Sequence, residues 1–104
     1  MVKLIPLSLK MVARFMVTVE FTSSLTHQTD APRCSVEGAT VRECLQAVFA
    51  MHPALRGYVM DDQNAVRQHV VVFLDGTATR DRRTQSDAVK PDSQIFVMQA
   101  LSGG

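Results

Sequence analysis

The chain reads Thr40-Val-Arg-Glu-Cys-Leu-Gln-Ala-Val-Phe49 near its middle, and this stretch has the pattern of an amphipathic helix. Thr40 and Glu43 are spaced as a capping box, in which each side chain is expected to bind the backbone amide of the other residue. The apolar side chains form the stripe of a core-facing helix: Val41, Cys44, Leu45, Val48 and Phe49. We expect His52-Pro53 to end the helix, because proline disfavours a helical backbone in the residue before it. Residues 54–60 are expected to add a short helical turn.

Strand patterns precede and follow this helix. Residues 14–21 alternate between polar and apolar side chains, with four apolar residues on one face: Phe15, Val17, Val19 and Phe21. This alternation predicts a half-buried strand. Residues 32–37 predict a second strand, antiparallel to the first, that ends at Gly38. Residues 67–74 form the most apolar predicted strand, and its unbroken apolar run predicts cover on both faces.

The last third of the chain alternates between turns and strands. Asp75-Gly76 predicts a tight turn, and residues 77–80 predict a short strand. Residues 80–90 predict a polar connection anchored only by Ala88 and Val89. Pro91-Asp92 is expected to turn the chain into a last strand over residues 94–101.

The predicted order is β-β-α-β-(β)-β with one main helix. One amphipathic helix can cover only one face of a four- to five-stranded sheet, which predicts a two-layer α+β domain. Five apolar residues are assigned to the helix side: Val70, Val72, Leu74, Ile95 and Val97. The alternate positions then fall on the open side: Val71, Phe73, Phe96 and Met98. If these strands are neighbours, the four form an exposed apolar patch of the kind that often marks a partner surface. The alternative interpretation is that they are strand formers partly covered by loops.

Composition argues against several classes of function. A chain of 104 residues predicts one domain, and its net charge of +1 gives no global case for binding nucleic acid or an acidic membrane. Residues 1–13 have the pattern of neither a transmembrane helix nor a secretory signal. We therefore expect a cytoplasmic protein with reduced thiols. The histidines and cysteines have no metal-ligand or catalytic spacing, so we expect neither a metal site nor an enzyme: His27, His52, His69, Cys34 and Cys44.

The chain ends on Leu101-Ser-Gly-Gly104, directly after the last predicted strand. Glycine has no Cβ, so this tail is expected to be thin and able to enter a narrow channel of another protein. Its carboxylate is ionised at neutral pH and could attack the α-phosphorus of ATP in an enzyme that positions both. The alternative is an ordinary floppy terminus. We expect an N-terminal extension over residues 1–13, the domain over 14–101 and a flexible tail over 102–104.

Three segments resemble the small sulfur-carrier proteins of the MoaD/ThiS type, which share the β-grasp fold of ubiquitin. The first is Ala39-Thr-Val-Arg-Glu-Cys-Leu45, at the start of the helix. The second runs from His52-Pro-Ala-Leu-Arg56 through an acidic loop to Arg67-Gln-His-Val-Val-Val-Phe-Leu-Asp75. The third is the last strand with its Gly-Gly tail, residues 89–104. The resemblance extends from about Arg14 to the end of the chain and implies a ubiquitin-like β-grasp with a mixed sheet.

The resemblance also implies a mechanism in which a partner supplies the catalysis. A ubiquitin-activating-type enzyme would use ATP to adenylate Gly104, and a persulfide or sulfide would displace AMP to leave a thiocarboxylate. The chain itself would bind no cofactor, and a second enzyme would receive the sulfur. Ser102 and Gly103 would supply a thin tail. Docking would be supplied by apolar residues: Val71, Phe73, Phe96, Met98 and Leu101.

Some features depart from the family pattern or leave alternatives open. Pro91-Asp92-Ser93 replaces the family's glycine-aspartate turn, and Gln99-Ala100 stands where a proline is common. The same tail could instead join a target lysine as a protein modifier, or could be idle in a plain interaction module. Arginines at 80, 82 and 83 predict a solvated turn, with docking to an acidic partner as the alternative.

Overall fold

The structure of the chain, a computed structural model, describes residues 14–22 and 33–99. The predicted N-terminal extension over residues 1–13 and the predicted tail over 102–104 lie outside the described residues. The described part contains the predicted main helix and most of the predicted strand residues.

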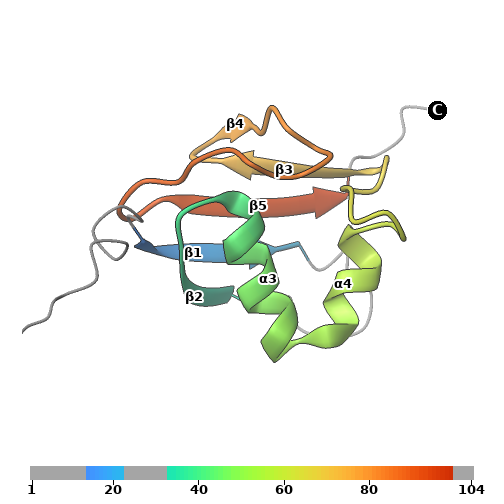
Figure 1. The fold of residues 1–104 in the computed structure, drawn as a ribbon, viewed down its shortest axis with the longest axis horizontal. Coiled ribbons are helices and arrows are strands. Elements are labelled where there is room, and N and C mark those ends of the chain that lie inside the picture. The colour runs from blue at the N-terminus through green and yellow to red at the C-terminus, as the bar shows by residue number, and fades with distance from the viewer. Residues whose placement is uncertain (1–13, 23–32, 100–104) are drawn as a thin grey trace, which may run out of the picture.

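A five-stranded mixed sheet forms one layer of the molecule (Figure 1). Its strands are β1 (Phe15–Phe21), β2 (Arg33–Gly38), β3 (Val70–Leu74), β4 (Thr77–Ala78) and β5 (Gln94–Gln99). Their order across the sheet is β2-β1-β5-β3-β4. The first and last strands of the chain, β1 and β5, are parallel neighbours, and the other neighbouring pairs are antiparallel.

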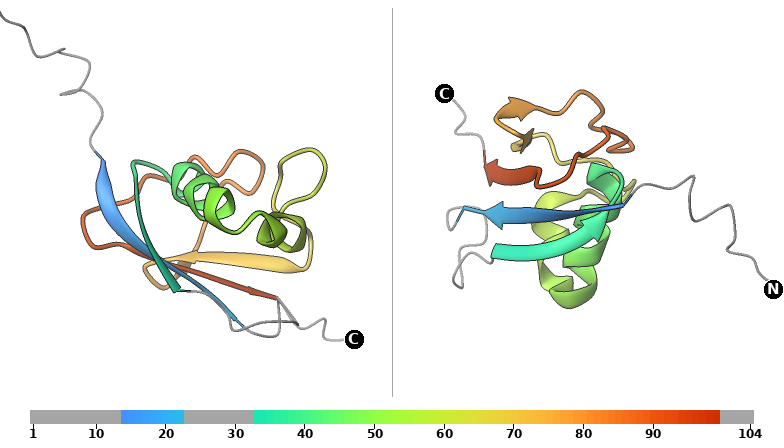
Figure 2. Two further views of the ribbon diagram at one scale, coloured as in Figure 1. Left: turned by 90° about the horizontal axis from the view of Figure 1, so that it is seen from below. Right: turned by 90° about the vertical axis from the view of Figure 1, so that its left-hand side faces the viewer.

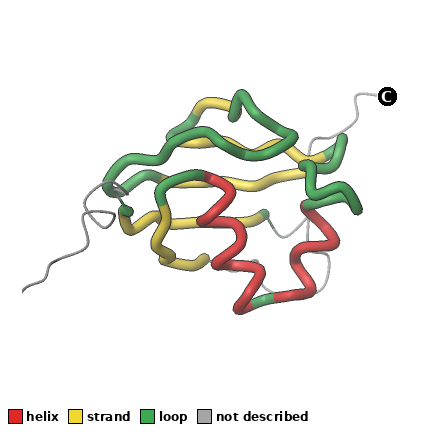
Figure 3. Tube along the Cα trace, in the orientation of Figure 1, coloured by secondary structure: helices red, strands yellow, loops and turns green. Residues whose placement is uncertain are grey.

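Two helices form the second layer. They are α3 (Val41–Met51) and α4 (Pro53–Val59), and both lie on the same face of the sheet (Figure 2). His52 separates them, as predicted, and Pro53 occupies the first turn of α4, where its missing amide hydrogen is not needed. Loops make up much of the chain between α4 and β5 (Figure 3). A mixed sheet with one main helix across one face is the ubiquitin-like β-grasp, which confirms the predicted fold class.

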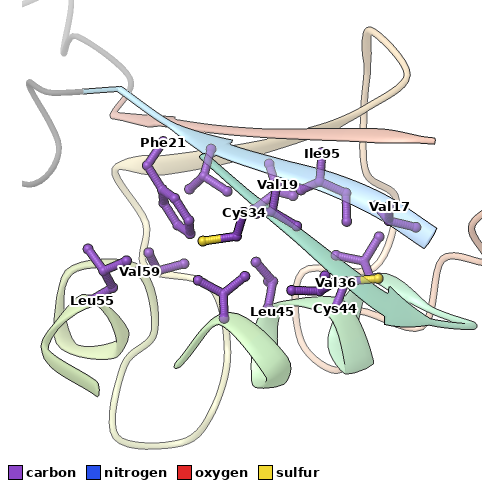
Figure 4. Close-up of a cluster of buried hydrophobic side chains, with 14 of the residues drawn as sticks. Val17, Val19, Phe21, Cys34, Val36, Cys44, Leu45, Leu55, Val59 and Ile95 are labelled. Carbon is purple, nitrogen blue, oxygen red and sulfur yellow. The ribbon is translucent and has the colours of Figure 1, made fainter. Parts of the chain in front are cut away.

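The core lies between the helices and the sheet (Figure 4). The predicted alternation of β1 is confirmed, because Val17, Val19 and Phe21 are at most 2% exposed. From the helices, α3 contributes its predicted stripe and α4 contributes Leu55 and Val59. Four of the five positions assigned to the helix side are buried: Val70, Val72, Ile95 and Val97. The fifth, Leu74, packs against the core while partly buried. Full burial of each such side chain stabilises the fold by roughly 1.5–3 kcal/mol.

The start of α3 differs from the predicted capping box in one hydrogen bond. Thr40 Oγ1 accepts from the Glu43 amide at 3.2 Å, as predicted. Glu43 Oε1, however, accepts from the amide of Ala39 at 2.8 Å, one residue before the predicted donor. The backbone amides of Val41 and Arg42 donate to carbonyl oxygens of the connection that precedes β5, at residues 87 and 85. The helix start is therefore capped by its own side chains and by a distant loop.

That connection is anchored differently from the prediction. Val89 is buried as expected, but Ala88 is exposed. Gln85 is the second anchor, only 2% exposed, with its side-chain amide donating to the carbonyl oxygens of Arg82 and Asn64 at 2.9 and 3.3 Å. A polar residue can be buried here because backbone carbonyls satisfy it.

The predictions for β3 and β4 were partly wrong. β3 begins at Val70 and not at residue 67, because residues 67–70 form a turn in which the Val70 amide donates to the carbonyl of Arg67. Its apolar run is buried on one face only, since both helices lie on the same side and leave Val71 and Phe73 half-buried. β4 contains only Thr77–Ala78. The Asp87 carboxylate accepts from the amides of Arg80 and Asp81, both at 2.9 Å, and so draws this backbone away from the sheet.

Candidate docking face

Four apolar residues meet on the sheet face opposite the helices. Val71 pairs with Met98 and Phe73 pairs with Phe96 across β3 and β5. Their positions alternate with the buried ones, so all four side chains point away from the helices. Phe96 is 36% exposed and the other three are half-buried. The structure thus brings together the four predicted patch residues, which we call the open-face patch: Val71, Phe73, Phe96 and Met98.

A shallow groove continues the open-face patch toward β1 and β2. The groove measures about 380 Å³ and is lined by Phe73, Phe96 and Met98 on one side. Glu20 and Arg33 line its other side. The register places Glu20 beside Phe96 in β5 and beside Arg33 in β2. Within the described residues neither charged side chain has an ion-pair partner. The face therefore combines an apolar centre with charged groups at its rim, as protein interfaces commonly do.

The start of β5 is held by a set of hydrogen bonds that the sequence did not predict. The Asp75 carboxylate accepts from the amide of Gln94 at 2.8 Å and from Ser93 Oγ at 2.9 Å. Ser93 Oγ in turn accepts from the amide of Lys90 at 2.8 Å, and the Ser93 side chain is buried. Sequence reasoning recognised Asp75-Gly76 as a turn, and both residues do have positive φ, 51° and 86°. The link from Asp75 to β5 gave no local signal because its partners lie 18 and 19 residues away.

A second groove lies on the helix side of the end of β5. It measures about 420 Å³, and its lining includes Tyr58 of α4, Arg67, His69 and Gln99. Gln99 is the last described residue of the chain. The end of β5 therefore lies between the open-face patch and a polar groove that contains a guanidinium and an imidazole. Sequence reasoning missed this groove, because its residues come from three separate segments.

The remaining predicted site residues lie outside the described residues: Leu101, Ser102, Gly103 and Gly104. The described end of β5 is the closest part of the structure to them along the chain. For the predicted site, the structure therefore describes the surface around the end of β5, the strand that precedes those residues.

Both cysteine thiols are shielded. Cys44 is 0% exposed and Cys34 is 8% exposed. Burial raises the pKa of the Cys44 thiol to about 11, and the neighbouring Glu43 carboxylate adds to the effect. Burial also raises the pKa of Cys34. Since the thiolate is the reactive form of cysteine, both side chains are poor nucleophiles.

Two aspartates organise the loops beside α4 and before β5. Asp61 accepts from the amides of Ala65 and Gln63, and these bonds lower its pKa. Asp81 accepts from the hydroxyls of Ser86 and Thr84 and from the Thr84 amide, and these bonds also hold its pKa well below its usual range. Both carboxylates thus cap the loop backbone.

The described residues offer little for other kinds of site. Across residues 14–22 and 33–99, no three of the histidine, cysteine, aspartate and glutamate side chains gather in a way that could hold a metal ion. None of the helices in this described part is long and apolar enough to cross a membrane.

Comparisons with known proteins agree with the fold. The sequence model of the ThiS family matches residues 24–104. A comparison with curated proteins found no significant match. Among solved structures, SAMP1 from Haloferax volcanii is 25% identical, with a TM-score of 0.67 over 86% of this chain and 99% of that chain.

Two structures with lower sequence identity share the fold. The small archaeal modifier protein 1 from Methanosarcina acetivorans is 17% identical, with a TM-score of 0.72 over 88% of this chain and 99% of that chain. A matched chain of the BexX/CysO complex from Amycolatopsis orientalis is 20% identical, with a TM-score of 0.67 over 85% of this chain and 99% of that chain. The family match covers most of the chain, and the β-grasp topology is the same. The chain therefore belongs to the ThiS family of small ubiquitin-fold carrier or modifier proteins, which are not themselves enzymes.

Proposed function

We propose that this chain is a sulfur carrier whose Gly104 carboxylate is adenylated and converted to a thiocarboxylate. The observation that carries the proposal is the open-face patch on β3 and β5, which lies on one face of the strand that leads toward Ser102-Gly103-Gly104. An enzyme that docks on this patch would receive the C-terminal residues from a defined direction. Membership of the ThiS family supports the same function.

The proposed chemistry takes place in two steps on a partner enzyme of the ubiquitin-activating type. The Gly104 carboxylate oxygen attacks the α-phosphorus of ATP, the bond to pyrophosphate breaks, and an acyl-adenylate forms. Hydrosulfide then attacks the acyl carbon, the bond to the AMP oxygen breaks, and a thiocarboxylate remains. ATP serves the partner and is not a cofactor of this chain. Because the reaction needs ATP and sulfide, the proposal places the protein in the cytoplasm.

The docking residues follow from the geometry of the open-face patch. Phe96 lines the groove and is the most exposed of the four. Buried aromatic anchors commonly contribute most of the binding energy of an interface. We therefore propose Phe96 as the main anchor, with Val71, Phe73 and Met98 around it and Leu101 next along the chain. A sulfur-acceptor enzyme would dock later at the same C-terminal residues.

The test is the intact mass of the purified protein after incubation with its adenylating enzyme, ATP and sulfide. The expected result is a mass increase equal to the exchange of one oxygen for one sulfur. A variant that lacks Gly104 should show no increase, and Phe96→Asp should slow it. An unchanged mass in the presence of an enzyme that hydrolyses ATP on contact with the carrier would contradict the proposal.

A second candidate function is that of a protein modifier. It is supported by the similarity to SAMP1 from Haloferax volcanii, the small archaeal modifier protein 1 of that organism. Both functions share the acyl-adenylate, and they differ in whether sulfide or a target lysine attacks it. Lysine-linked conjugates in extracts of the source organism, lost when Gly104 is deleted, would favour the modifier.

A further inference from the structure

Five arginines gather around the loop that joins α4 to β3. Arg56 and Arg67 both lie close enough to Asp61 for their positive charges to help lower the pKa of its carboxylate. Arg82 Nη2 donates to the carbonyl oxygen of Arg67 at 2.6 Å. Arg83 and Asp61 line one hollow, and Arg42 and Arg56 line another. We call this the arginine surface: Arg42, Arg56, Arg67, Arg82 and Arg83.

The guanidinium groups of the arginine surface are available to a partner. In the described part of the chain the only ion pair is between Arg14 and Glu43, so none of the five has a carboxylate partner. Four of them are exposed, and Arg82 is half-buried. Arg67 and Arg82 each use one nitrogen on a backbone carbonyl. For Arg42, Arg56 and Arg83, no side-chain hydrogen bond exists among the described residues.

Nearby carboxylates offset only part of the positive charge of this surface. Asp61 and Asp81 are directed at loop amides and hydroxyls, as described above. With Asp62 and Asp87 they make four carboxylates, against the five guanidinium groups of the arginine surface and that of the neighbouring Arg80, while the whole chain carries only +1. The arginine surface is therefore a local positive region on a nearly neutral protein.

The arginine surface is continuous with the helix-side groove at the end of β5. Arg67 belongs to both, and the groove also contains His69 and Gln99. The loops that carry residues 61–66 and 80–86 project on the same side of the sheet as the helices (Figure 2). An enzyme that encloses the chain beyond Gln99 would thus meet the open-face patch on one side and the arginine surface on the other.

We infer that the arginine surface binds an acidic segment of the adenylating enzyme, an inference that rests on the proposed function. Arginine forks match carboxylates in geometry and can bind them with two hydrogen bonds. A nucleic acid is a poorer match, because its affinity depends on neutralising many phosphates, and this domain has a net charge of only +1. The acidic segment would steer the carrier onto the enzyme and would hold the helix side while the apolar patch docks.

The test uses the full chain as the varied substrate of its adenylating enzyme, with AMP formation as the readout. The variant is Arg56→Glu combined with Arg83→Glu, since neither side chain makes a hydrogen bond within the described residues. The control is Lys90→Glu, which reverses one charge where the double variant reverses two. Lys90 is an exposed cation just before the start of β5, at the opposite end of that strand from Gln99. Circular dichroism and thermal melting establish that all three proteins fold alike.

The expected result is a kcat/KM about tenfold lower for the double variant, since electrostatic steering changes association rates by roughly 10- to 1000-fold. Its kcat at saturation should stay within about twofold of the wild type, because the lost contact is one of association. Added salt should shrink the difference, since charges are screened beyond about 10 Å at 0.1 M. The Lys90→Glu control should behave as the wild type.

Failure of this inference and failure of the proposed function have different signatures. If the wild type is adenylated and the double variant matches it in kcat/KM, the arginine surface does not bind the enzyme. A loss of about threefold or more for Lys90→Glu would overturn the inference too, because one charge reversal of two would then give half of the tenfold effect on a logarithmic scale, as net charge alone predicts. If the wild type is never adenylated, the proposed function fails. Binding of a single-stranded RNA 20-mer at physiological salt, abolished in the double variant, would assign the surface to nucleic acid instead.

Discussion

At the residue scale, burial determines what the two cysteines can do. Cys34 and Cys44 lie in the core, and burial keeps both thiols protonated at neutral pH. A protein that handles activated acyl groups and sulfide would be damaged by a reactive thiol of its own, because a thiolate attacks both acyl-adenylates and persulfides. The core position of these residues leaves the C-terminal carboxylate as the group on which the proposed sulfur transfer takes place.

The raised pKa of Cys44 predicts a loss of stability at alkaline pH. The folded thiol titrates at about 11, whereas an unfolded cysteine titrates at about 8.5. The unfolded state therefore loses its proton first, and the free energy of unfolding falls as pH rises from about 8.5 to 11, on the order of 3 kcal/mol in total from this group. Urea unfolding of the wild type and of Cys44→Ala at pH 8 and pH 11 measures the effect. Equal pH dependence in the two proteins would contradict the prediction.

Gly38 and Gly57 predict opposite effects of the same substitution. A Cβ at Gly38 would lie 2.8 Å from Cys44 Sγ and 3.2 Å from the Cys44 backbone nitrogen. Gly38→Ala should therefore destabilise the fold by about 1–3 kcal/mol through overpacking against α3. A Cβ at Gly57, within α4, would meet nothing within 4 Å, so Gly57→Ala should stabilise by about 0.5–1 kcal/mol. Urea denaturation of both variants checks the pair, and a destabilising Gly57→Ala would show that α4 is more crowded than described.

At the element scale, the most important piece is the hydrogen-bonded start of β5. Asp75 in the β3–β4 turn binds Ser93 and Gln94, so the strand that leads toward the C-terminus is aligned by a turn on its neighbour. The Asp75 carboxylate accepts a hydrogen bond from the backbone amide of Gln94. Because the acceptor is charged, this bond is stronger than one between neutral groups. This link positions Phe96 against Phe73 and so helps to maintain the open-face patch.

Ser93→Ala should loosen this element. The substitution removes the donor to Asp75 Oδ2 and the acceptor for the Lys90 amide. Because Ser93 is buried, an unsatisfied amide there should cost about 1–3 kcal/mol of stability. Ser35→Ala on β2 is the matched control, since Ser35 is exposed. Denaturation gives the stability, and hydrogen exchange at the Gln94 amide should accelerate in Ser93→Ala alone. Unchanged exchange at Gln94 would mean that Asp75 holds the start of β5 without help from the Ser93 hydroxyl.

Elements with a local pattern could be predicted from the sequence, and elements that depend on distant contacts could not. The apolar residues of α3 and of β1 recur at the spacing that places them on one buried face, so both elements were predicted correctly. The run Val70–Leu74 by itself predicted cover on both faces, because five apolar residues in a row show no polar alternation. Only the count of one main helix assigned Val71 and Phe73 to the open side. The hydrogen bonds of Asp75 and Gln85 join segments that are far apart in the sequence. The bond between Glu43 and the Ala39 amide differs by one residue from the standard capping box. No local pattern encodes them.

At the scale of the whole molecule, the two faces of the sheet at the end of β5 differ in chemistry. The open-face patch could be predicted, since strand alternation assigns Val71, Phe73, Phe96 and Met98 to one side once the helix covers the other. The arginine surface could not, because its residues come from α3, α4 and two loops that only the fold brings together. The proposed partner would therefore recognise the carrier through an apolar contact and an electrostatic contact on opposite sides of one strand.

These two contacts should contribute independently to recognition. Effects of substitutions at separate sites usually add as free energies, and the open-face patch and the arginine surface lie on opposite faces of the sheet. Phe96→Ala should lower kcat/KM for adenylation by about tenfold, as expected for an aromatic anchor worth roughly 1–2 kcal/mol. Combined with Arg56→Glu and Arg83→Glu, the loss should approach the product of the two separate losses, about a hundredfold. The measurement is a double-mutant cycle on kcat/KM. A melting curve for each variant checks that its stability matches that of the wild type. A combined loss no greater than either single loss would show that one structural element of the partner touches both faces, and the two surfaces would then have to be treated as a single site.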